Sequence, residues 1–365
     1  GKAFGEASAS DSYLSAAASA LTYGDKLNSS GYTGTQVRTV SERERSSMPL
    51  FRCTARGNYV NNNKLMGWLI LICLSPFSAW TIAQPEWRDG TWVQRDIAYR
   101  EDTQQRLDIY WSAGAEDSQN PFDPTYSARP TLFWIHGGGW IVGDKAQPNL
   151  RSLIDPYLQS GWRVISINYR QGANTAPQAV DDSLCAYRFI EDDLAAANMA
   201  RHSTVVSGSS AGGHLALTVG LWNSSNRAHP CRAREKPAAI VNIFGITDIA
   251  KVDEFLADPS QPPVWKNYAR IWAGSAAKVS AISATYSPMQ MITDAAPPII
   301  TIHGTQDRLV PYAQAQALHE QLTGTHHLHT IPNGGHGNFS PQEWTDAYDV
   351  IMTFLGGIPL GGMTN

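Results

Sequence analysis

The sequence is poor in charged residues and in cysteine. Charged residues make up 16% of its 365 residues, whereas a typical soluble domain has about a quarter. The 28 basic and 32 acidic residues leave a net charge of −4, which excludes a polybasic nucleic-acid binder and an acidic disordered tail. The four cysteines, Cys53, Cys73, Cys185 and Cys231, form no CxxC pair and no Cys/His spacing of the kind that a structural zinc needs. We therefore expect neither a metal nor a nucleic-acid partner.

The sequence also lacks an apolar run that is long enough to span a bilayer. No charged residue occurs from Leu65 to Pro85, and the compact apolar run within this stretch is Leu65 to Leu74. This run ends shortly before Pro76 and is shorter than the roughly 20 residues that a spanning helix needs. Basic residues precede this run and small residues follow it up to Ala83, as in a secretory signal peptide. A buried core helix is the alternative, but such a helix rarely has a one-sided basic flank.

We expect residues 65–83 to be a signal peptide that is cleaved after Ala83. Residues 1–64 are rich in Ala, Ser, Gly and Asn and show no hydrophobic periodicity, so we expect them to be a disordered leader or tag. The sequence thus predicts a secreted or periplasmic protein with no stable membrane insertion after cleavage.

From Trp87 onward, short apolar runs alternate with helical patterns. The first two runs alternate apolar and polar residues, as an antiparallel edge pair does, whereas later runs such as TLFWI are continuously apolar, as strands covered on both faces are. Residues 84–365 therefore predict an α/β fold, with a mostly parallel eight-stranded sheet and helices on both faces. The predicted strands are Val93 to Tyr99, Leu107 to Trp111, Thr131 to His136, Arg163 to Asn168, Thr204 to Ser207, Ala239 to Phe244, Ile299 to His303 and Leu328 to Ile331. The predicted helices are Asn149 to Gln159, Ala179 to Ala197, Ala211 to Trp222, Ala313 to Leu322 and Pro341 to Leu355.

The interval 245–298 interrupts this alternation. It contains two Pro-rich patches and several aromatic residues, and we expect it to form a short cap over the carboxyl ends of the strands. The aromatic residues are Phe255, Trp265, Tyr268, Trp272 and Tyr286.

The motif GSSAGG, residues 208–213, follows a predicted strand directly and precedes a predicted helix. A serine between glycines at such a turn is typical of a nucleophile elbow, because the tight turn needs small neighbours and lifts the hydroxyl above the sheet. A plain Gly-rich turn is the alternative interpretation. Ser210 is the central serine of the motif, and we predict it to be the nucleophile.

A second glycine-rich motif, HGGGW (136–140), ends the strand TLFWI. Consecutive glycines leave backbone N–H groups uncovered, and two such groups can point at one oxygen, as an oxyanion hole requires. A phosphate-binding loop is the rival interpretation, since Gly138 and Gly143 have the right interval. Asp144 stands where that loop needs lysine, which disfavours it.

A nucleophilic serine needs a base and an acid that orients the base. Asp307 follows the strand PPIITIHG, and the loop NGGHGNF presents His336 between glycines. The order Ser210, Asp307, His336 is that of α/β-hydrolases. Among ten histidines, only His336 combines a loop after a strand, glycine neighbours and this order.

The motifs HGGGW, GSSAGGH, HGTQDRLVP and GGHGNF, in this order and spacing, resemble the α/β-hydrolase esterases of the hormone-sensitive-lipase-like group. The resemblance is strongest to the bacterial carboxylesterase branch, which is also similar to arylformamidases, and it covers about 91–355. It implies the α/β-hydrolase fold, a triad of Ser210, Asp307 and His336, and an oxyanion hole of backbone N–H groups. The implied donors are those of Gly138, Gly139 and Ala211. One departure is Ser209, which stands where many relatives carry Asp.

These features predict a serine carboxylic ester hydrolase that works through an acyl-enzyme, without metal or organic cofactor, on a small-molecule ester. Arylformamidase and feruloyl or acetyl esterase activity are the alternatives among enzymes. A noncatalytic binding protein with the hydrolase fold is the alternative of another class. The sequence leaves the oligomeric state open.

Trp140 lies beside the predicted oxyanion glycines, so we expect it to frame the substrate pocket together with aromatic residues of the cap. Aromatic walls with few charges favour an apolar acyl or aryl group. The sequence thus predicts short to medium acyl chains, of about two to eight carbons. The alternative is that these aromatic residues only pack the cap onto the sheet.

Cys185 and Cys231 are the only cysteines that remain after removal of the predicted signal and leader. One lies on the helix before the nucleophile strand and the other follows the helix after it, so both could reach the same side of the sheet. We expect a disulfide bond between them, with two separate buried thiols as the alternative.

Overall fold

The computed structural model describes residues 85–112, 129–196, 204–260 and 266–360. All of these belong to one unit of the chain, and a second unit, 23–81, lies outside the described residues. The expected leader and signal peptide, residues 1–83, therefore lie outside them too, as does Trp265 of the expected cap. None of the described helices is both long and apolar enough to cross a membrane.

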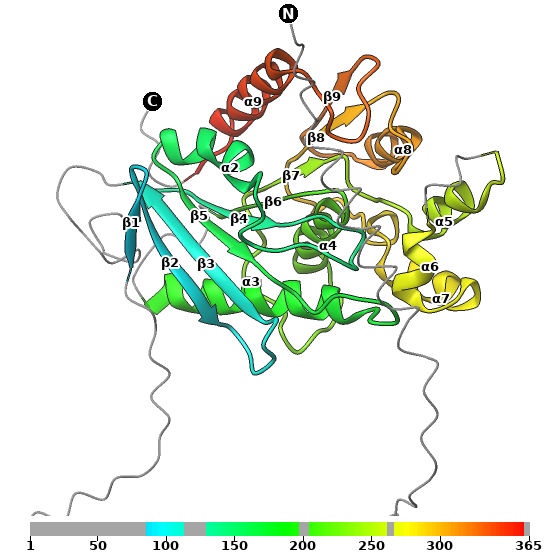
Figure 1. Ribbon diagram of the computed structural model, residues 1–365, viewed down its shortest axis with the longest axis horizontal. Coiled ribbons are helices and arrows are strands. Elements are labelled where there is room, and N and C mark those ends of the chain that lie inside the picture. Colours follow the sequence, from blue (N-terminus) through cyan, green and yellow to red (C-terminus); the bar gives the residue numbers. More distant parts are fainter. Residues whose placement is uncertain (1–84, 113–128, 197–203, 261–265, 361–365) are drawn as a thin grey trace, which may run out of the picture. The chain divides into compact units, whose positions relative to one another are not determined.

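A nine-stranded sheet runs through the described part of the chain, in the order β1-β2-β3-β5-β4-β6-β7-β8-β9 (Figure 1). Neighbours from β1 to β5 pair antiparallel, and those from β5 to β9 pair parallel. This confirms the predicted mostly parallel sheet with antiparallel strands at one edge. The strands are β1 (Glu86–Arg88), β2 (Thr91–Ala98), β3 (Arg106–Ser112), β4 (Thr131–Ile135), β5 (Arg163–Ile167), β6 (Thr204–Ser209), β7 (Ala239–Ile243), β8 (Ile299–Gly304) and β9 (His326–Ile331).

The predicted number of eight strands was wrong, because β1 was missed. This strand has only three residues, all exposed, so it carries no buried apolar pattern. It pairs with β2 across a turn at Asp89 and Gly90, both with positive φ, of 48° and 75°. Asp-Gly with this backbone is a strong local signal for a tight hairpin, and it could have revealed the strand.

Helices cover both faces of the sheet, as predicted. Successive strand residues point to opposite faces, so a continuously apolar strand has apolar side chains to bury on each face. On β4, Phe133 and Ile135 join the core under one layer of helices, and Leu132 and Trp134 join the core on the other face. The first layer contains α3 (Gln178–Ala196), α4 (Ala211–Ser224) and α8 (Ala313–Gln321), and the second contains α2 (Leu150–Gln159) and α9 (Pro341–Gly356). Figure 1 shows α2 and α3 on opposite sides of the strands.

In the described residues of the interval 245–298, which was expected to be a short cap, there are three helices and one 3-10 turn. They are α5 (Ile249–Ala257), α6 (Tyr268–Ala273), α7 (Ala276–Tyr286) and η3 (Pro288–Gln290). The side chains of Asp248, Asn267 and Ser275 accept hydrogen bonds from backbone N–H groups in the first turns of α5, α6 and α7. These caps satisfy N–H groups that helix geometry leaves unpaired and so set where each short helix begins.

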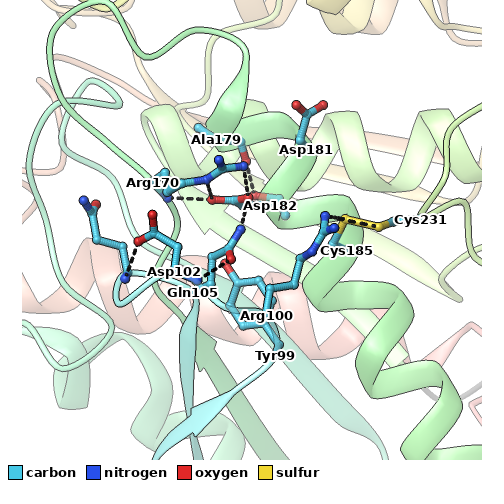
Figure 2. Close-up of polar contacts among 12 residues, drawn as sticks. Tyr99, Arg100, Asp102, Gln105, Arg170, Ala179, Asp181, Asp182, Cys185 and Cys231 are labelled. Atoms are coloured by element: carbon cyan, nitrogen blue, oxygen red, sulfur yellow. Dashed lines mark hydrogen bonds and ion pairs between the residues drawn. A yellow bond between two sulfur atoms is a disulfide. The ribbon is translucent and has the colours of Figure 1, made fainter. Parts of the chain in front are cut away.

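A disulfide bond joins Cys185 on α3 to Cys231, as predicted. Figure 2 shows Arg100 beside it, with Nη1 3.1 Å from Cys185 Sγ. Nearby, Asp182 of α3 accepts hydrogen bonds from Arg170 and from Gln105. These contacts fasten α3 to the segments that follow β5 and precede β3.

Candidate active site

Ser210 lies between β6 and α4 in a backbone conformation that serine rarely adopts, with φ 56° and ψ −121°. Its amide N–H donates to the carbonyl of Ile243, 2.9 Å away on the neighbouring strand β7. A Cβ added to Gly208 would lie 2.4 Å from the Gly212 oxygen, and one added to Gly212 would lie 2.0 Å from the Ile135 oxygen. Only glycine therefore fits on either side of this sharp turn, which has the geometry of a nucleophile elbow.

The loop HGGGW packs directly against the elbow. A Cβ added to Gly137 would lie 2.8 Å from the Ser209 oxygen and 3.3 Å from Ser210 Cβ. Gly138 and Gly139 both have positive φ, of 110° and 61°, and the Gly138 carbonyl accepts from the N–H groups of the turn that follows. The loop thus doubles back beside Ser210.

Three backbone N–H groups near Ser210 donate no hydrogen bond within the described residues. They belong to Gly138, Gly139 and Ala211, which are the predicted oxyanion donors. Ala211 is the first residue of α4, and the amino end of a helix favours negative charge. The structure therefore brings the HGGGW loop and the α4 terminus to the same serine.

His136 and Tyr169 hold this loop from beneath. Burial lowers the pKa of His136 to about 4, so the imidazole is neutral, and its Nδ1 lies 2.7 Å from the Gly137 oxygen. Since that oxygen can only accept, Nδ1 carries the proton. The Tyr169 ring stacks on His136 with centroids 4.4 Å apart, and its hydroxyl donates to the His136 carbonyl.

Asp307 and His336 are joined by a hydrogen bond of 2.7 Å between Oδ2 and Nδ1. The other carboxylate oxygen accepts from the backbone N–H groups of Leu309 and Val310. Burial raises the pKa of Asp307, but the neighbouring His336 and His303 outweigh burial and hold this pKa well below its usual range. The carboxylate is therefore ionised and fixed in orientation.

His336 and Ser210 each lie next to a residue at the end of β7. The His336 ring lies against Phe244, with centroids 4.6 Å apart, and Phe244 directly follows Ile243, which accepts from the Ser210 amide. The loops of Asp307 and His336 also touch, since a Cβ added to Gly304 would lie 2.3 Å from the Gly334 oxygen. The described hydrogen bonds include none between Ser210 Oγ and His336 Nε2.

Trp140 does not line an open pocket, contrary to the prediction. Its side chain is 0% exposed, and its ring stacks on Trp272 of the cap with centroids 4.4 Å apart. Its indole N–H donates to His214 Nδ1 at 3.2 Å. The ring packs between the HGGGW loop and the cap, which is the alternative role for these aromatic residues.

Two further residues reach this site: His214, to which no role was assigned from the sequence, and Tyr268, one of the cap aromatic residues that were expected to frame the pocket. His214 lies one turn after Ser210 on α4, and Tyr268 of α6 lies beside Gly139, where an added Cβ would lie 3.0 Å from Tyr268 Cβ. The Tyr268 hydroxyl donates to the Leu309 carbonyl at 2.9 Å, in the loop of Asp307. No group of three or more His, Cys, Asp or Glu in the described residues has an arrangement that could hold a metal ion.

The sequence of this chain matches a known protein family. The model of the BD-FAE family matches residues 119–322, more than half of the chain. The chain belongs to the BD-FAE family. The BD-FAE match includes Ser210 and Asp307 and ends before His336.

Curated relatives and solved structures agree with the BD-FAE match. The probable carboxylic ester hydrolase LipM of Mycobacterium tuberculosis is 29% identical over 196 residues, which are 53% of this chain and 44% of that protein. Esterase LipC of the same organism is 26% identical over 260 residues, 67% of this chain and 59% of that protein. The chain thus spans about half the length of the curated relatives it matches. These matches confirm the predicted resemblance to α/β-hydrolase esterases.

The fold itself is shared with solved esterases. A carbohydrate esterase from gut microbiota has a TM-score of 0.58 at 22% identity, covering 72% of this chain and 95% of that one. Esterase 2 of Thermogutta terrifontis, solved with bound propionate, has a TM-score of 0.54 at 22% identity, covering 74% and 96%. The predicted α/β-hydrolase fold is confirmed.

Proposed function

We propose that this BD-FAE chain is a serine carboxylic ester hydrolase that acts on short to medium acyl or aryl esters through an acyl-enzyme. The observation that carries the proposal is the 2.7 Å hydrogen bond from His336 Nδ1 to Asp307, at the edge of the sheet where Ser210 stands in its strained turn. The names of its relatives, carboxylic ester hydrolase and esterase, support the same reaction.

In the first half of the proposed reaction, Ser210 Oγ attacks the acyl carbon of the ester. Because His336 Nδ1 donates to the ionised Asp307, Nε2 is left with a lone pair and takes the serine proton. His336 then gives that proton to the leaving alcohol as the C–O bond breaks. In the second half, water attacks the acyl-enzyme by the same route, and the acid and free Ser210 are released.

The proposed oxyanion hole consists of the N–H groups of Gly138, Gly139 and Ala211. They are unpaired within the described residues, so they are free to donate to the oxygen that becomes negative in each tetrahedral intermediate. Loss of one such donor typically lowers kcat by about 10² to 10³-fold.

The proposed range of acyl groups is supported by solved esterase structures with a similar fold. Esterase 2 of Thermogutta terrifontis has been solved with bound propionate and with bound butyrate. Esters on carbohydrates, including acetyl and feruloyl esters, are a second candidate class, which the neighbour named as a carbohydrate esterase favours. We also propose secretion or periplasmic export, which the disulfide bond in the fold supports, because disulfides persist in oxidising compartments.

The test combines labelling with substrate hydrolysis. A fluorophosphonate should label one serine, found by peptide mass spectrometry in the segment that holds residues 208–213, and labelling should abolish hydrolysis of 4-nitrophenyl butyrate. A parallel panel of methyl ferulate, acetylated xylan and N-formylkynurenine separates the candidate substrates. Absence of both labelling and hydrolysis of any ester or amide would indicate a noncatalytic binding protein.

A further inference from the structure

His214 occupies a junction of three parts of the molecule. Its backbone N–H donates to the Ser210 carbonyl, 3.0 Å away, in the first turn of α4. Its ring is fully buried and lies edge-on to Trp140, with centroids 5.1 Å apart, and to Trp272 of the cap. The elbow, the HGGGW loop and the cap therefore meet at one side chain.

The two ring nitrogens of His214 have different partners. Nδ1 lies 3.2 Å from the Trp140 indole nitrogen, and an indole can only donate, so Nδ1 accepts. Nε2 lies 2.9 Å from the Tyr286 carbonyl at the end of α7, which can only accept, so Nε2 carries the proton. Burial lowers the pKa of His214 to about 4, which keeps this neutral form in place at neutral pH.

The Trp140 bond spans the two halves of the proposed oxyanion hole. Trp140 directly follows Gly138 and Gly139, whose N–H groups belong to the loop, whereas His214 lies on α4, whose first N–H group is that of Ala211. Within the described residues, this side-chain hydrogen bond connects Trp140, the residue after the loop glycines, to α4. A small shift between loop and helix would move donors that must point at the same oxygen.

We propose that His214 is a positioning residue for ester hydrolysis. By accepting from Trp140, it sets the position of the Gly138 and Gly139 N–H groups relative to the Ala211 N–H group. By donating to the Tyr286 carbonyl, it also fixes the position of the cap relative to the HGGGW loop and α4. This inference rests on the proposed function and adds a residue that acts through the oxyanion donors without touching substrate.

Two substitutions separate the two hydrogen bonds. In His214→Asn, the amide oxygen can stand where Nδ1 stands and still accept from Trp140, but nothing reaches Tyr286. In His214→Gln, the longer side chain can donate to Tyr286, but no acceptor remains at the Nδ1 position. We expect His214→Gln to lower kcat by about 10- to 100-fold, below the loss of a whole oxyanion donor, with KM changed less than about threefold. His214→Asn should retain most of kcat.

Trp140→Phe tests the same bond from its other end, because it removes the N–H group and keeps a ring against Trp272. It should match His214→Gln, and the double variant should be no worse than either single variant, since both remove one bond. The control is Trp134→Phe, which removes a buried indole N–H that has no hydrogen-bond partner among the described residues and lies on the other face of the sheet. It should leave kcat within about twofold.

All rates are measured per fluorophosphonate-titrated site, below the unfolding temperature of each variant. Inhibition by a trifluoromethyl ketone, whose serine adduct places an oxygen in the oxyanion hole, should weaken with kcat, whereas a purely structural role would lower only the unfolding temperature. Equal kcat in the Asn and Gln variants, or additive losses in the double variant, would overturn the proposal. Failure of the proposed function is separate, because wild-type protein would then hydrolyse no ester.

Discussion

Ser209 and Ser210 are adjacent, but only Ser210 has the backbone of an elbow, with φ 56°, and Ser209 is buried. Ser210→Ala should lower kcat for 4-nitrophenyl butyrate by at least about 10⁴-fold and leave thermal unfolding nearly unchanged, since the hydroxyl packs against no core. Ser209→Ala should keep kcat within about tenfold. Equal losses in the two variants, or fluorophosphonate on Ser209, would reverse the assignment.

Asp307 couples the proposed chemistry to acid stability. The folded state holds its pKa below the usual value, with burial opposed by His336 and His303, so its ionised form stabilises the fold. This contribution should be complete above the ordinary Asp pKa of about 4 and decline as the pH falls further toward the folded-state pKa. Asp307→Asn should therefore be less stable than wild type at pH 5 to 7, and this gap should begin to narrow as the pH falls below about 4.

Urea unfolding of both proteins across this range measures the difference. A gap that stays constant from pH 7 to 3 would show that Asp307 is not the titrating group. The same variant should lose about 10⁴-fold in kcat, because an amide favours the wrong His336 tautomer.

The turn between β6 and α4 tolerates no side chain at Gly212, where an added Cβ would lie 2.0 Å from the Ile135 oxygen. A backbone atom cannot move aside as a flexible side chain can, so Gly212→Ala should lower the free energy of unfolding by about 1–3 kcal/mol or more. Gly356→Ala is the matched control, since no atom lies within 4 Å of its added Cβ and alanine favours helices. Urea unfolding should find the control unchanged or slightly stabilised.

The disulfide bond fastens α3 to the segment that follows α4, across a sequence separation of 46. In the loop-entropy model such a closure contributes up to about 4 kcal/mol. The double variant Cys185→Ser, Cys231→Ser should unfold at a lower urea concentration, with a free energy of unfolding that is lower by up to about 4 kcal/mol. Mass spectrometry of unreduced peptides should find the two cysteines linked, and a peptide map with both residues alkylated before reduction would refute the bond.

At the scale of the whole fold, the described part of the cap, helices α5, α6 and α7, packs on the HGGGW loop, with Tyr268 beside Gly139 and hydrogen-bonded to the Leu309 carbonyl in the Asp307 loop. Such packing restricts room near the serine, so acyl chains of about two to eight carbons should react faster than longer ones. Tyr268→Ala should shift the optimum to longer chains. Rates on a series of 4-nitrophenyl esters measure this, and faster hydrolysis of emulsified long-chain triglyceride than of a soluble butyrate would contradict it.

Much of this protein was predictable from sequence because the determining signals are local. The continuously apolar strands, the GSSAGG turn and the loops of Asp307 and His336 each need particular residue types within a few positions, where sterics and hydrogen bonding act along the chain. The strand order that brings those loops to one edge follows from the parallel topology. Even the missed strand β1 carried a local signal at Asp89 and Gly90.

What tertiary structure alone decided concerns residues whose partners lie far away in the sequence. Trp140 could face substrate or pack, and its choice depends on Trp272 and His214, which arrive from the cap and from α4. The bond from Trp140 to His214 joins residues 74 positions apart, and no periodicity encodes such a pair. Burial and shape complementarity between separate elements are properties of the packed molecule, so they select partners that local chemistry leaves open.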